Sequence, residues 1–392
     1  MVASVDALLL LQQLEELTEN PPSHVMNNDK LRIKLRDAAR NFSIAMETEG
    51  DTIHRITSLP LQPAMAKIGI DLNLFEILAA SESPMSSATL AKQTGVDPIL
   101  MKRMLRYYAS FRMMLEEDED KFTPSNVTKA LVPDGSKAGV HYFFDSVQGT
   151  FTELPKYLKD SNYKNPSDAT HTAWQLTHKT DLHPFVWLQQ NPKNFVDCIT
   201  WMTAQRAGLP IWLDVYPFEE LTKGVTPETP LFIDVGGGVG HQCLALKERF
   251  PDVQGRVVLQ DRPEVIEHSL PIEGVEKEPY DFWTPEPIKG ARAYYMRNIM
   301  HDWPDEKCLL ILGNLKSAMT DESVILIDEM ILPEKGTHWR AAQLDITMMS
   351  CLAALERSKN QWHTLIEAAG LKIAKVYTYT EELQDSIIVV TK

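Results

Sequence analysis

Residues 231–240 read LFIDVGGGVG, and this stretch decides the fold of the chain. An apolar strand ends at Asp234 and runs into a glycine-rich turn, which is followed by a helical pattern from His241 to Phe250. A strand, a glycine turn and a helix in this order are typical of the first βα unit of a nucleotide-binding fold. The stretch therefore predicts an α/β domain that binds a nucleotide-like ligand at the carboxyl end of this strand.

The spacing of the glycines indicates which ligand is bound. A dinucleotide fingerprint needs glycine at its first, third and sixth positions, but the sixth position here is His241. The motif instead has Asp234 two positions before the series Gly236, Gly238 and Gly240, which resembles the first motif of S-adenosylmethionine-dependent methyltransferases. This ligand has no pyrophosphate, but it has an ammonium group that a strand-end carboxylate can bind. A tight turn in an unrelated α/β protein is the alternative.

Strands and helices alternate through the rest of the chain. Strands are expected at 231–235, 256–260, 291–297, 323–328, 371–378 and 386–391, with a short one before Asp281, and helices at 241–250, 263–270, 303–319 and 359–369. This alternation predicts an α/β fold with a doubly wound, mostly parallel seven-stranded Rossmann-like sheet whose last two strands form an antiparallel edge pair. We expect three domains: a helical, winged-helix dimerisation domain (1–125), a helical linker and substrate-pocket segment (126–225) and the catalytic domain (226–392).

The winged-helix pattern lies before residue 125. A short helix, a turn at Gly95 and a helix starting at Pro98 precede a hairpin formed by 113–115 and 121–123. DNA binding is the alternative to a packing role, but the tip of the hairpin, residues 116–120, consists of five acids where phosphate contact needs Lys or Arg. We therefore expect a dimerisation module.

Composition restricts the partners. The 392 residues carry a formal net charge of −15, which argues against a nucleic-acid or anionic-membrane partner. The four cysteines show no CxxC spacing, and no apolar run reaches transmembrane length. The N-terminal leucines lack the basic region of a signal peptide. We expect a cytoplasmic protein with no metal site.

Acidic residues at two further strand ends are candidates for cofactor binding. The strand RVVLQ ends at Asp261, where an acid can bind the ribose hydroxyls, although Pro263 also makes a helix cap possible. Asp281 can pair with the amino group of adenine, and Phe282 can cover the ring.

The segment YYMRNIMHDWPDEKCLLIL contains the clearest catalytic candidate. A strand brings His301 to the edge of the sheet where such folds bind ligands, and Asp302 is expected to cap a helix that starts at Trp303. Glu329 ends the next strand and Glu356 precedes the following helix. An imidazole beside carboxylates is what a general base needs, because one carboxylate can hold the second ring N–H. Either Glu could also be a solvated helix cap.

The glycine motif, the acid after the second strand, HDWPDE, ILPEKG and ALERSKNQW occur in an order that resembles the caffeic-acid-type O-methyltransferases, and most of all their fungal natural-product branch. The resemblance covers nearly the whole chain. It implies a homodimer, His301 as general base, and Glu329 and Glu356 bracketing it. The implied S-adenosylmethionine site comprises Asp234, Gly236, Gly237, Gly238, Asp261, Asp281, Phe282 and Arg297.

The substrate implied by the resemblance is a hydroxylated small molecule. Leu352 stands near a position where plant members hold their phenol with a polar group, which favours a larger, more apolar substrate of the aromatic or polyketide type. Candidates for the pocket wall are Trp174, Phe185, Met202, Met348 and Met349, although such side chains are often plain core.

Two other functions remain open from the sequence. Some fungal relatives keep S-adenosylmethionine bound as a positive charge and use it in dehydration and pericyclic ring closure, without methyl transfer. A winged-helix regulator that binds a small ligand is the non-enzymatic alternative. The presence of His301, Glu329 and Glu356 together favours methyl transfer.

Overall fold

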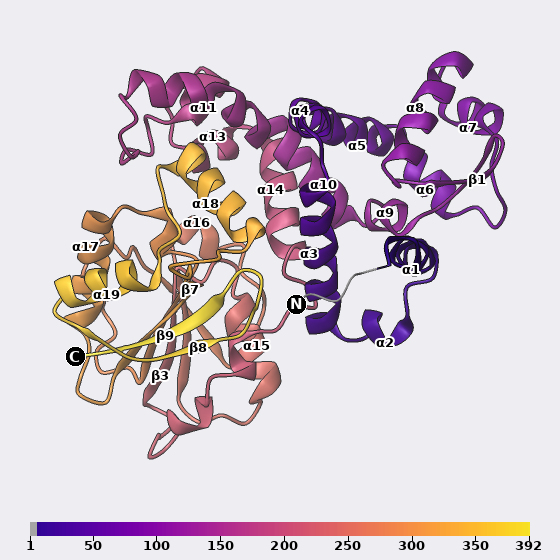
Figure 1. The fold of residues 1–392 in the computed structure, drawn as a ribbon. Coiled ribbons are helices and arrows are strands. Elements are labelled where there is room, and N and C mark those ends of the chain that lie inside the picture. The colour runs from indigo at the N-terminus through magenta and orange to yellow at the C-terminus, as the bar shows by residue number, and fades with distance from the viewer. Residues whose placement is uncertain (1–5) are drawn as a thin grey trace. The chain divides into compact units, whose positions relative to one another are not determined.

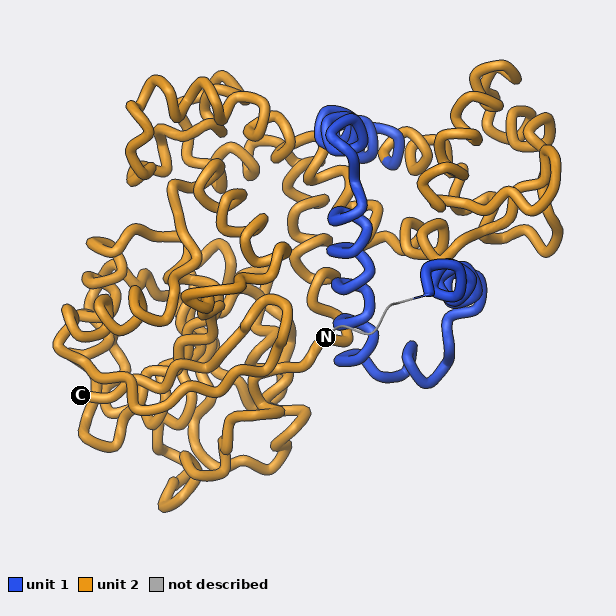
Figure 2. The backbone as a smooth tube through the Cα atoms, viewed as in Figure 1, with its two compact units in different colours: residues 1–66 blue, residues 67–392 orange. Residues whose placement is uncertain are grey.

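A computed structural model describes residues 6–392 of the chain. The chain divides into two units, residues 1–66 and residues 67–392 (Figure 2). The boundaries expected near residues 125 and 225 both fall inside the second unit. The functional division into three domains therefore stays a prediction.

The described part of the first unit, from residue 6 on, is helical and has no buried core of its own. Its helices are α1 (Ala7–Glu19), α2 (Ser23–Met26), α3 (Asp29–Ala45), α4 (Glu49–Ser58) and the beginning of α5 (Leu61–Asp71). Side chains cap several of them, as in α4, where Thr48 and Asp51 form a capping box. No side chain among residues 6–65 is buried, so the described part of this unit has little internal packing.

The second unit begins with the expected helices and hairpin. The elements after α5 are α6 (Leu74–Ala79), α7 (Ser87–Thr94), α8 (Pro98–Ser110), β1 (Leu115–Asp118) and β2 (Lys121–Thr123). Gly95 ends α7 in the left-handed conformation, and Asp97 caps α8 with Pro98 in its first turn. β1 and β2 pair in antiparallel fashion, and β1 includes three of the five consecutive acids.

Residues 126–225 are mainly helical, as predicted. The segment contains α9 (Asn126–Ala130), α10 (Asp134–Tyr142), the π-helical turn η1 (Phe143–Val147), α11 (Gln148–Asp160), α12 (Ala173–His178), α13 (Pro184–Gln190), α14 (Pro192–Ala204) and the 3-10 turns η2 (Trp212–Asp214) and η3 (Phe218–Glu220).

The predicted sheet is confirmed. Its seven strands are β3 (Pro230–Val235), β4 (Arg256–Asp261), β5 (Val275–Pro279), β6 (Ala293–Arg297), β7 (Val324–Met330), β8 (Lys372–Thr378) and β9 (Asp385–Thr391). Their order is β5-β4-β3-β6-β7-β9-β8, parallel from β5 to β7, with β9 antiparallel to both β7 and β8 (Figure 1). The strand order reverses between β3 and β6, and a fold of this type binds ligands where the order reverses.

Helices cover both faces of the sheet. Those of this domain are α15 (His241–Arg249), α16 (Pro263–Ile266), α17 (Asp305–Lys316), α18 (Trp339–Leu352) and α19 (Lys359–Ala368). Side chains of α17 and α19 pack on one face of the strands, and those of α15, η2 and η3 pack on the other. Because each buried strand supplies apolar side chains to both faces, the strand sequences are continuously hydrophobic.

Two predicted helices differ from the observed ones. α17 begins at Asp305 rather than at Trp303, and Asp302 lies in the 3-10 turn η4 (Met300–Asp302), so the predicted cap at Asp302 is wrong. The reason is Pro304, because the residue before a proline disfavours helical geometry and Trp303 is extended. α16 also ends earlier than predicted, at Ile266. Within residues 6–392, no helix combines the length and the hydropathy needed to cross a bilayer.

Candidate active site

The glycine turn after β3 leaves its backbone open to a ligand. Gly236, Gly238 and Gly240 all have positive φ, at 70°, 61° and 96°, which side-chain-bearing residues rarely adopt. A Cβ placed on Gly237 would lie 2.5 Å from Cγ of Asp234. The turn therefore needs glycine both for its conformation and for its close approach to the strand-end acid.

Asp234 is a buried acid with unused hydrogen-bonding capacity. It is 1% exposed, its Oδ2 accepts from the Cys243 thiol at 3.5 Å, and its Oδ1 has no hydrogen-bond partner within the part of the chain that the structure describes. Burial raises the pKa of Asp234 to about 7. An ammonium group bound nearby would compensate this buried carboxylate, which fits the cofactor predicted from the sequence.

Asp261 is tied to the same glycine turn. Its Oδ2 accepts the backbone N–H of Gly238 at 2.8 Å, and its Oδ1 accepts that of Arg262 at 2.7 Å. The backbone carbonyl of Gln260 accepts the N–H groups of Gly236 and Gly237, at 2.8 and 3.1 Å. The ends of β3 and β4 thus form one hydrogen-bonded unit, as expected of a site for the ribose. The residue before α16 is Arg262, and Asp261 does not serve as its cap.

Of the three residues predicted to surround adenine, one lies beside the glycine turn, one is exposed and one lies near a buried carboxylate. Phe282 lies beside the turn, with Cε1 3.6 Å from the position of a Cβ on Gly236. Asp281 is exposed and accepts the N–H of Trp283 at 3.1 Å. The Nε of Arg297 lies 3.6 Å from the buried carboxylate of Asp328, so its role beside adenine remains a prediction.

His301 and Glu356 are brought into direct contact. Nδ1 of His301 and Oε1 of Glu356 are 2.8 Å apart, although the residues are 55 positions apart in the chain. Nε2 of His301 lies 3.5 Å from Oδ1 of Asp302. The imidazole is 14% exposed and is therefore largely shielded from solvent. A carboxylate on Nδ1 fixes the ring and its tautomer, so that Nε2 is the free base.

Glu329 mainly holds the backbone of the turn that carries His301. Its Oε1 accepts the N–H groups of Ile299, Met300 and His301 at 2.8, 2.9 and 3.3 Å. Its Oε2 lies 4.0 Å from Nδ1 of His301 and has no hydrogen-bond partner among the described residues. Glu329 and Glu356 are both buried, so neither is the solvated helix cap that the sequence left open.

The protonation of these groups is coupled. Burial by itself lowers the pKa of His301. The nearby carboxylates of Glu356, Glu329 and Asp302 raise this pKa by more than burial lowers it, so it lies well above its ordinary value. Burial raises the pKa of Glu329 to about 7 and that of Asp302 to about 6. Protons at this site therefore belong to the group as a whole.

The same three side chains could accept a divalent cation by spacing alone. One donor atom each from His301, Glu329 and Glu356 lies within 4.8 Å of the others. Nδ1 of His301 is already hydrogen-bonded to Oε1 of Glu356, so a cation bound at these two atoms would have to displace the shared proton. The absence of a metal stays our prediction.

The predicted pocket residues fall into two groups. Trp174 is buried in a cluster that includes Leu352 and Ala354, against which Met348 packs, and Ala354 lies two residues before Glu356. Met349 is half-buried on the same helix, α18. Phe185 and Met202, by contrast, are 41% and 50% exposed, and this cluster does not include them.

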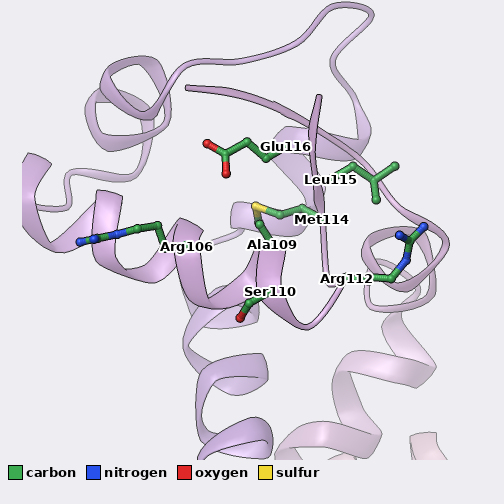
Figure 3. A pocket seen from close by; sticks show the side chains of 7 residues that line it. All are labelled: Arg106, Ala109, Ser110, Arg112, Met114, Leu115 and Glu116. Atoms are coloured by element: carbon green, nitrogen blue, oxygen red, sulfur yellow. The ribbon is translucent and has the colours of Figure 1, made fainter. Parts of the chain in front are cut away.

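A hollow in the surface lies apart from the elements that carry the predicted site residues. It has a volume of about 410 Å³ and lies between α8 and β1, where Figure 3 shows Arg106 and Arg112 extending in different directions. Its lining is Arg106, Ala109, Ser110, Arg112, Met114, Leu115 and Glu116. None of the predicted site residues lies on these elements, so this hollow is not the candidate active site.

The sequence did not single out several residues that contact the site. Arg357 follows Glu356 directly, and its guanidinium donates to the carbonyls of Met300 and Trp303, on either side of His301. Tyr142 is partly buried against the cluster around Trp174, and the charge of Asp302 contributes to raising its pKa, after desolvation and two cysteines. Adjacency to Glu356 was a usable signal for Arg357, whereas nothing local in the sequence marks Tyr142.

Comparison with known proteins identifies the family of the chain. Residues 222–372 match the O-methyltransferase domain family, and residues 61–134 match the O-methyltransferase dimerisation domain. O-methyltransferase ucdC of Aspergillus ustus is 39% identical over 363 residues, which are 92% of this chain and 95% of the relative. The chain belongs to the O-methyltransferase family. The predictions of a Rossmann-like fold and of an S-adenosylmethionine-dependent O-methyltransferase are confirmed.

Further relatives of this O-methyltransferase differ in their described activities. Demethylsterigmatocystin 6-O-methyltransferase of Aspergillus parasiticus is 35% identical and matches 94% of this chain and 95% of its own. A solved structure described as a pericyclic reaction enzyme has a TM-score of 0.89 and 36% identity, with 97% of this chain and 99% of the other covered. LepI in complex with SAM gives the same TM-score and identity.

The buried carboxylate of Asp234 predicts how cofactor affinity depends on pH. Because its pKa is raised to about 7, binding a cation favours the ionised form, and affinity for S-adenosylmethionine falls as pH drops below 7. Asp234→Asn should weaken binding by about one to two orders of magnitude and remove this dependence. Calorimetric titration at several pH values measures both effects.

The exposed acid Asp252 provides the matched control, and Asp252→Asn should bind as the native protein does. The pH range from about 5.5 to about 8 brackets the raised pKa of Asp234. If the affinity of the native protein for S-adenosylmethionine stays constant over this range, the assigned role of Asp234 is contradicted.

Proposed function

We propose that this enzyme transfers a methyl group from S-adenosylmethionine to a hydroxyl of a secondary metabolite, with His301 as general base. The observation that carries the proposal is the 2.8 Å contact between Nδ1 of His301 and Oε1 of Glu356 in a buried turn at the carboxyl edge of the sheet. The family match supplies the reaction class, and this contact supplies the base.

The bound cofactor supplies a methyl group on a sulfonium, whose positive charge is lost when the methyl leaves. The substrate hydroxyl would give its proton to Nε2 of His301 as its oxygen accepts this methyl group. The N–H at Nδ1 of His301 goes on donating to the carboxylate of Glu356, which stabilises the imidazolium that forms. Because a phenol has a pKa near about 10, it needs this help at neutral pH.

The substrate is proposed to be apolar apart from its hydroxyl. Support comes from the buried cluster around Trp174, whose last member along the chain, Ala354, lies two residues before Glu356. The carboxylates of Asp302, Glu329 and Glu356 near His301 disfavour an anionic substrate. Relatives named demethylsterigmatocystin 6-O-methyltransferase and 16-O-methyltransferase bsc6, the latter from Alternaria brassicicola, are by name O-methyltransferases, which supports a hydroxyl as the acceptor group.

A pericyclase or dehydratase that keeps the cofactor intact is the second candidate. It is favoured by the similarity to the pericyclic reaction enzyme, at 36% identity over almost the whole chain. Such a reaction needs the positive charge of the cofactor but no base that takes a proton from a nucleophile. The oriented imidazole of His301 is therefore the feature that favours methyl transfer.

We also propose a cytoplasmic homodimer in which residues 1–125 form a winged-helix dimerisation domain. The match of residues 61–134 to the dimerisation domain supports this assembly. A further support is the apolar surface of the first unit, where Leu8, Leu9 and Leu11 are 79%, 52% and 52% exposed. Helices without a core of their own are stabilised by packing against another surface.

The mass of the product distinguishes the two candidate reactions. Incubation with isotopically labelled S-adenosylmethionine and an extract of the host's metabolites should give a product that gains one labelled carbon, together with S-adenosylhomocysteine. A product without label whose mass equals that of the substrate, or that of the substrate minus water, would establish the pericyclase or dehydratase instead, provided that the cofactor remains intact.

Removal of the imidazole should abolish turnover without loss of cofactor binding. His301→Ala is expected to lower kcat by about 10²–10⁴-fold, the usual contribution of a general base. Its Kd for S-adenosylmethionine should stay close to native, because Asp234 and Asp261 are untouched. His268→Ala, at an exposed histidine, is the control. Methylation by His301→Ala at the native rate would exclude the assigned base.

The charge of Glu356 should set the pH dependence of the reaction. The base must be neutral, and its pKa is well above the ordinary value, so kcat/KM should rise with pH through a value above about 6.5. Glu356→Gln removes a carboxylate that stabilises the imidazolium, so this rise should move to lower pH while the maximal rate falls. A pH profile that is identical in the variant would contradict the pairing.

A further inference from the structure

Arg357 is a buried cation whose position the proposed mechanism does not explain. Its side chain is 1% exposed, whereas its carboxylate partner, Asp305, is 64% exposed. Burying a guanidinium is costly, and an ion pair with a surface carboxylate does not require it. The burial must therefore serve the other contacts of the guanidinium.

Those contacts are made to the backbone around His301. Nη1 of Arg357 donates to the carbonyl of Met300, and Nη2 donates to that of Trp303, each at 2.8 Å. Nε and Nη2 also donate to Oδ1 of Asp305, at 2.9 and 2.7 Å. The two carbonyls belong to the residue before His301 and to the second residue after it, so one planar group spans the catalytic turn.

Two groups of opposite charge hold the backbone of this turn, the carboxylate of Glu329 at its N–H groups and the guanidinium of Arg357 at its carbonyls. Oε1 of Glu329 accepts the N–H groups of residues 299–301, and the guanidinium of Arg357 binds carbonyls at the start and just beyond the end of the turn. The carbonyl of Met300 also accepts the N–H of Trp303 at 3.3 Å, but a short 3-10 turn leaves most of its terminal N–H and C=O groups to partners outside it. A carboxylate at exposed N–H groups and a cation at exposed carbonyls are also the arrangement that the peptide dipoles favour.

Arg357 is connected to Glu356 as well as to His301. The two residues are neighbours in the chain, and the N–H of Leu355 donates to the carbonyl of His301 at 3.3 Å. The carbonyl of Arg357 accepts the N–H of Leu332 at 3.0 Å, which ties this segment to the chain just after β7. A displacement of Arg357 would therefore change both partners of the bond between His301 and Glu356.

We propose that Arg357 is a positioning residue for methyl transfer, which holds the carbonyls of Met300 and Trp303 so that the His301 imidazole stays on the Glu356 carboxylate. The proposal rests on the proposed role of His301 as base. Lysine cannot replace arginine here, because a guanidinium presents donors in a rigid fork that reaches two carbonyls and a carboxylate at once, and an ammonium is a point charge.

The test compares Arg357→Lys and Arg357→Met in the full-length enzyme. Arg357→Met should lower kcat by about 10²-fold, the effect expected of a displacement near 1 Å at a reacting group. Arg357→Lys keeps the charge and should recover part of this loss. KM for the acceptor and Kd for S-adenosylmethionine should remain close to native, because no group that binds either ligand changes. Arg340→Lys, at an exposed arginine paired with Glu382, is the matched control.

The double variants separate positioning from a purely structural role. If Arg357 acts through the bond between His301 and Glu356, Arg357→Lys should have little further effect on kcat in the Glu356→Gln background. Two losses that multiply in full would overturn the proposal, as would native kcat in Arg357→Lys. Cofactor titration gives the fraction of folded enzyme, and Tm gives its stability. If kcat falls only in proportion to the folded fraction, the proposal is also overturned.

These outcomes are distinct from a failure of the proposed function. If His301→Ala retains native turnover, the base is misassigned and the inference loses its foundation. If His301→Ala is inactive while Arg357→Lys is fully active, the base stands and only the role of Arg357 is excluded.

Discussion

The structure depends on a hydrogen bond between an imidazole and a carboxylate that the fold brings together from distant parts of the chain. Nδ1 of His301 meets Oε1 of Glu356 at 2.8 Å, across 55 residues of sequence. Each of the two residues lies in irregular backbone just after a regular element, His301 after β6 and Glu356 after α18. The local backbone therefore does not fix the position of either side chain, and other parts of the fold have to do so. The sheet fixes the end of β6, and Glu329 at the end of β7 then fixes the turn η4 that carries the imidazole.

Burying several acids beside one base has consequences for its protonation. Desolvation raises the pKa of Glu329 to about 7 and that of Asp302 to about 6, while the same carboxylates hold the pKa of His301 well above its ordinary value. The site therefore retains protons that an exposed group would release.

The sequence predicted the sheet and the cofactor turn well because both rest on local patterns. The glycines of 236–240, the strand-end acids and the alternation of strands and helices depend on short-range geometry that a sequence displays directly. The pairing of His301 with Glu356 was accessible only as a shared sheet edge together with a resemblance. The helix expected at Trp303 failed because Pro304 imposes an extended residue before it.

Other parts of the site were out of reach of sequence reasoning for a physical reason. Arg357 and Tyr142 are placed by contacts with residues far away in the chain, and no sequence periodicity records such contacts. The exposure of Phe185 and Met202 likewise follows from the packing of the helical segment rather than from residue type. Aromatic and methionine side chains fill cores and line pockets alike, so composition alone does not assign them.

The tautomer of His301 tests the central claim most directly. In enzyme labelled with ¹⁵N at histidine and bound to S-adenosylhomocysteine, NMR spectra recorded above the pKa of the base should show a protonated Nδ1 and an unprotonated Nε2. That result is expected if Glu356 holds the Nδ1 proton and leaves Nε2 to accept a proton from the substrate. A protonated Nε2 with a bare Nδ1 would contradict the account.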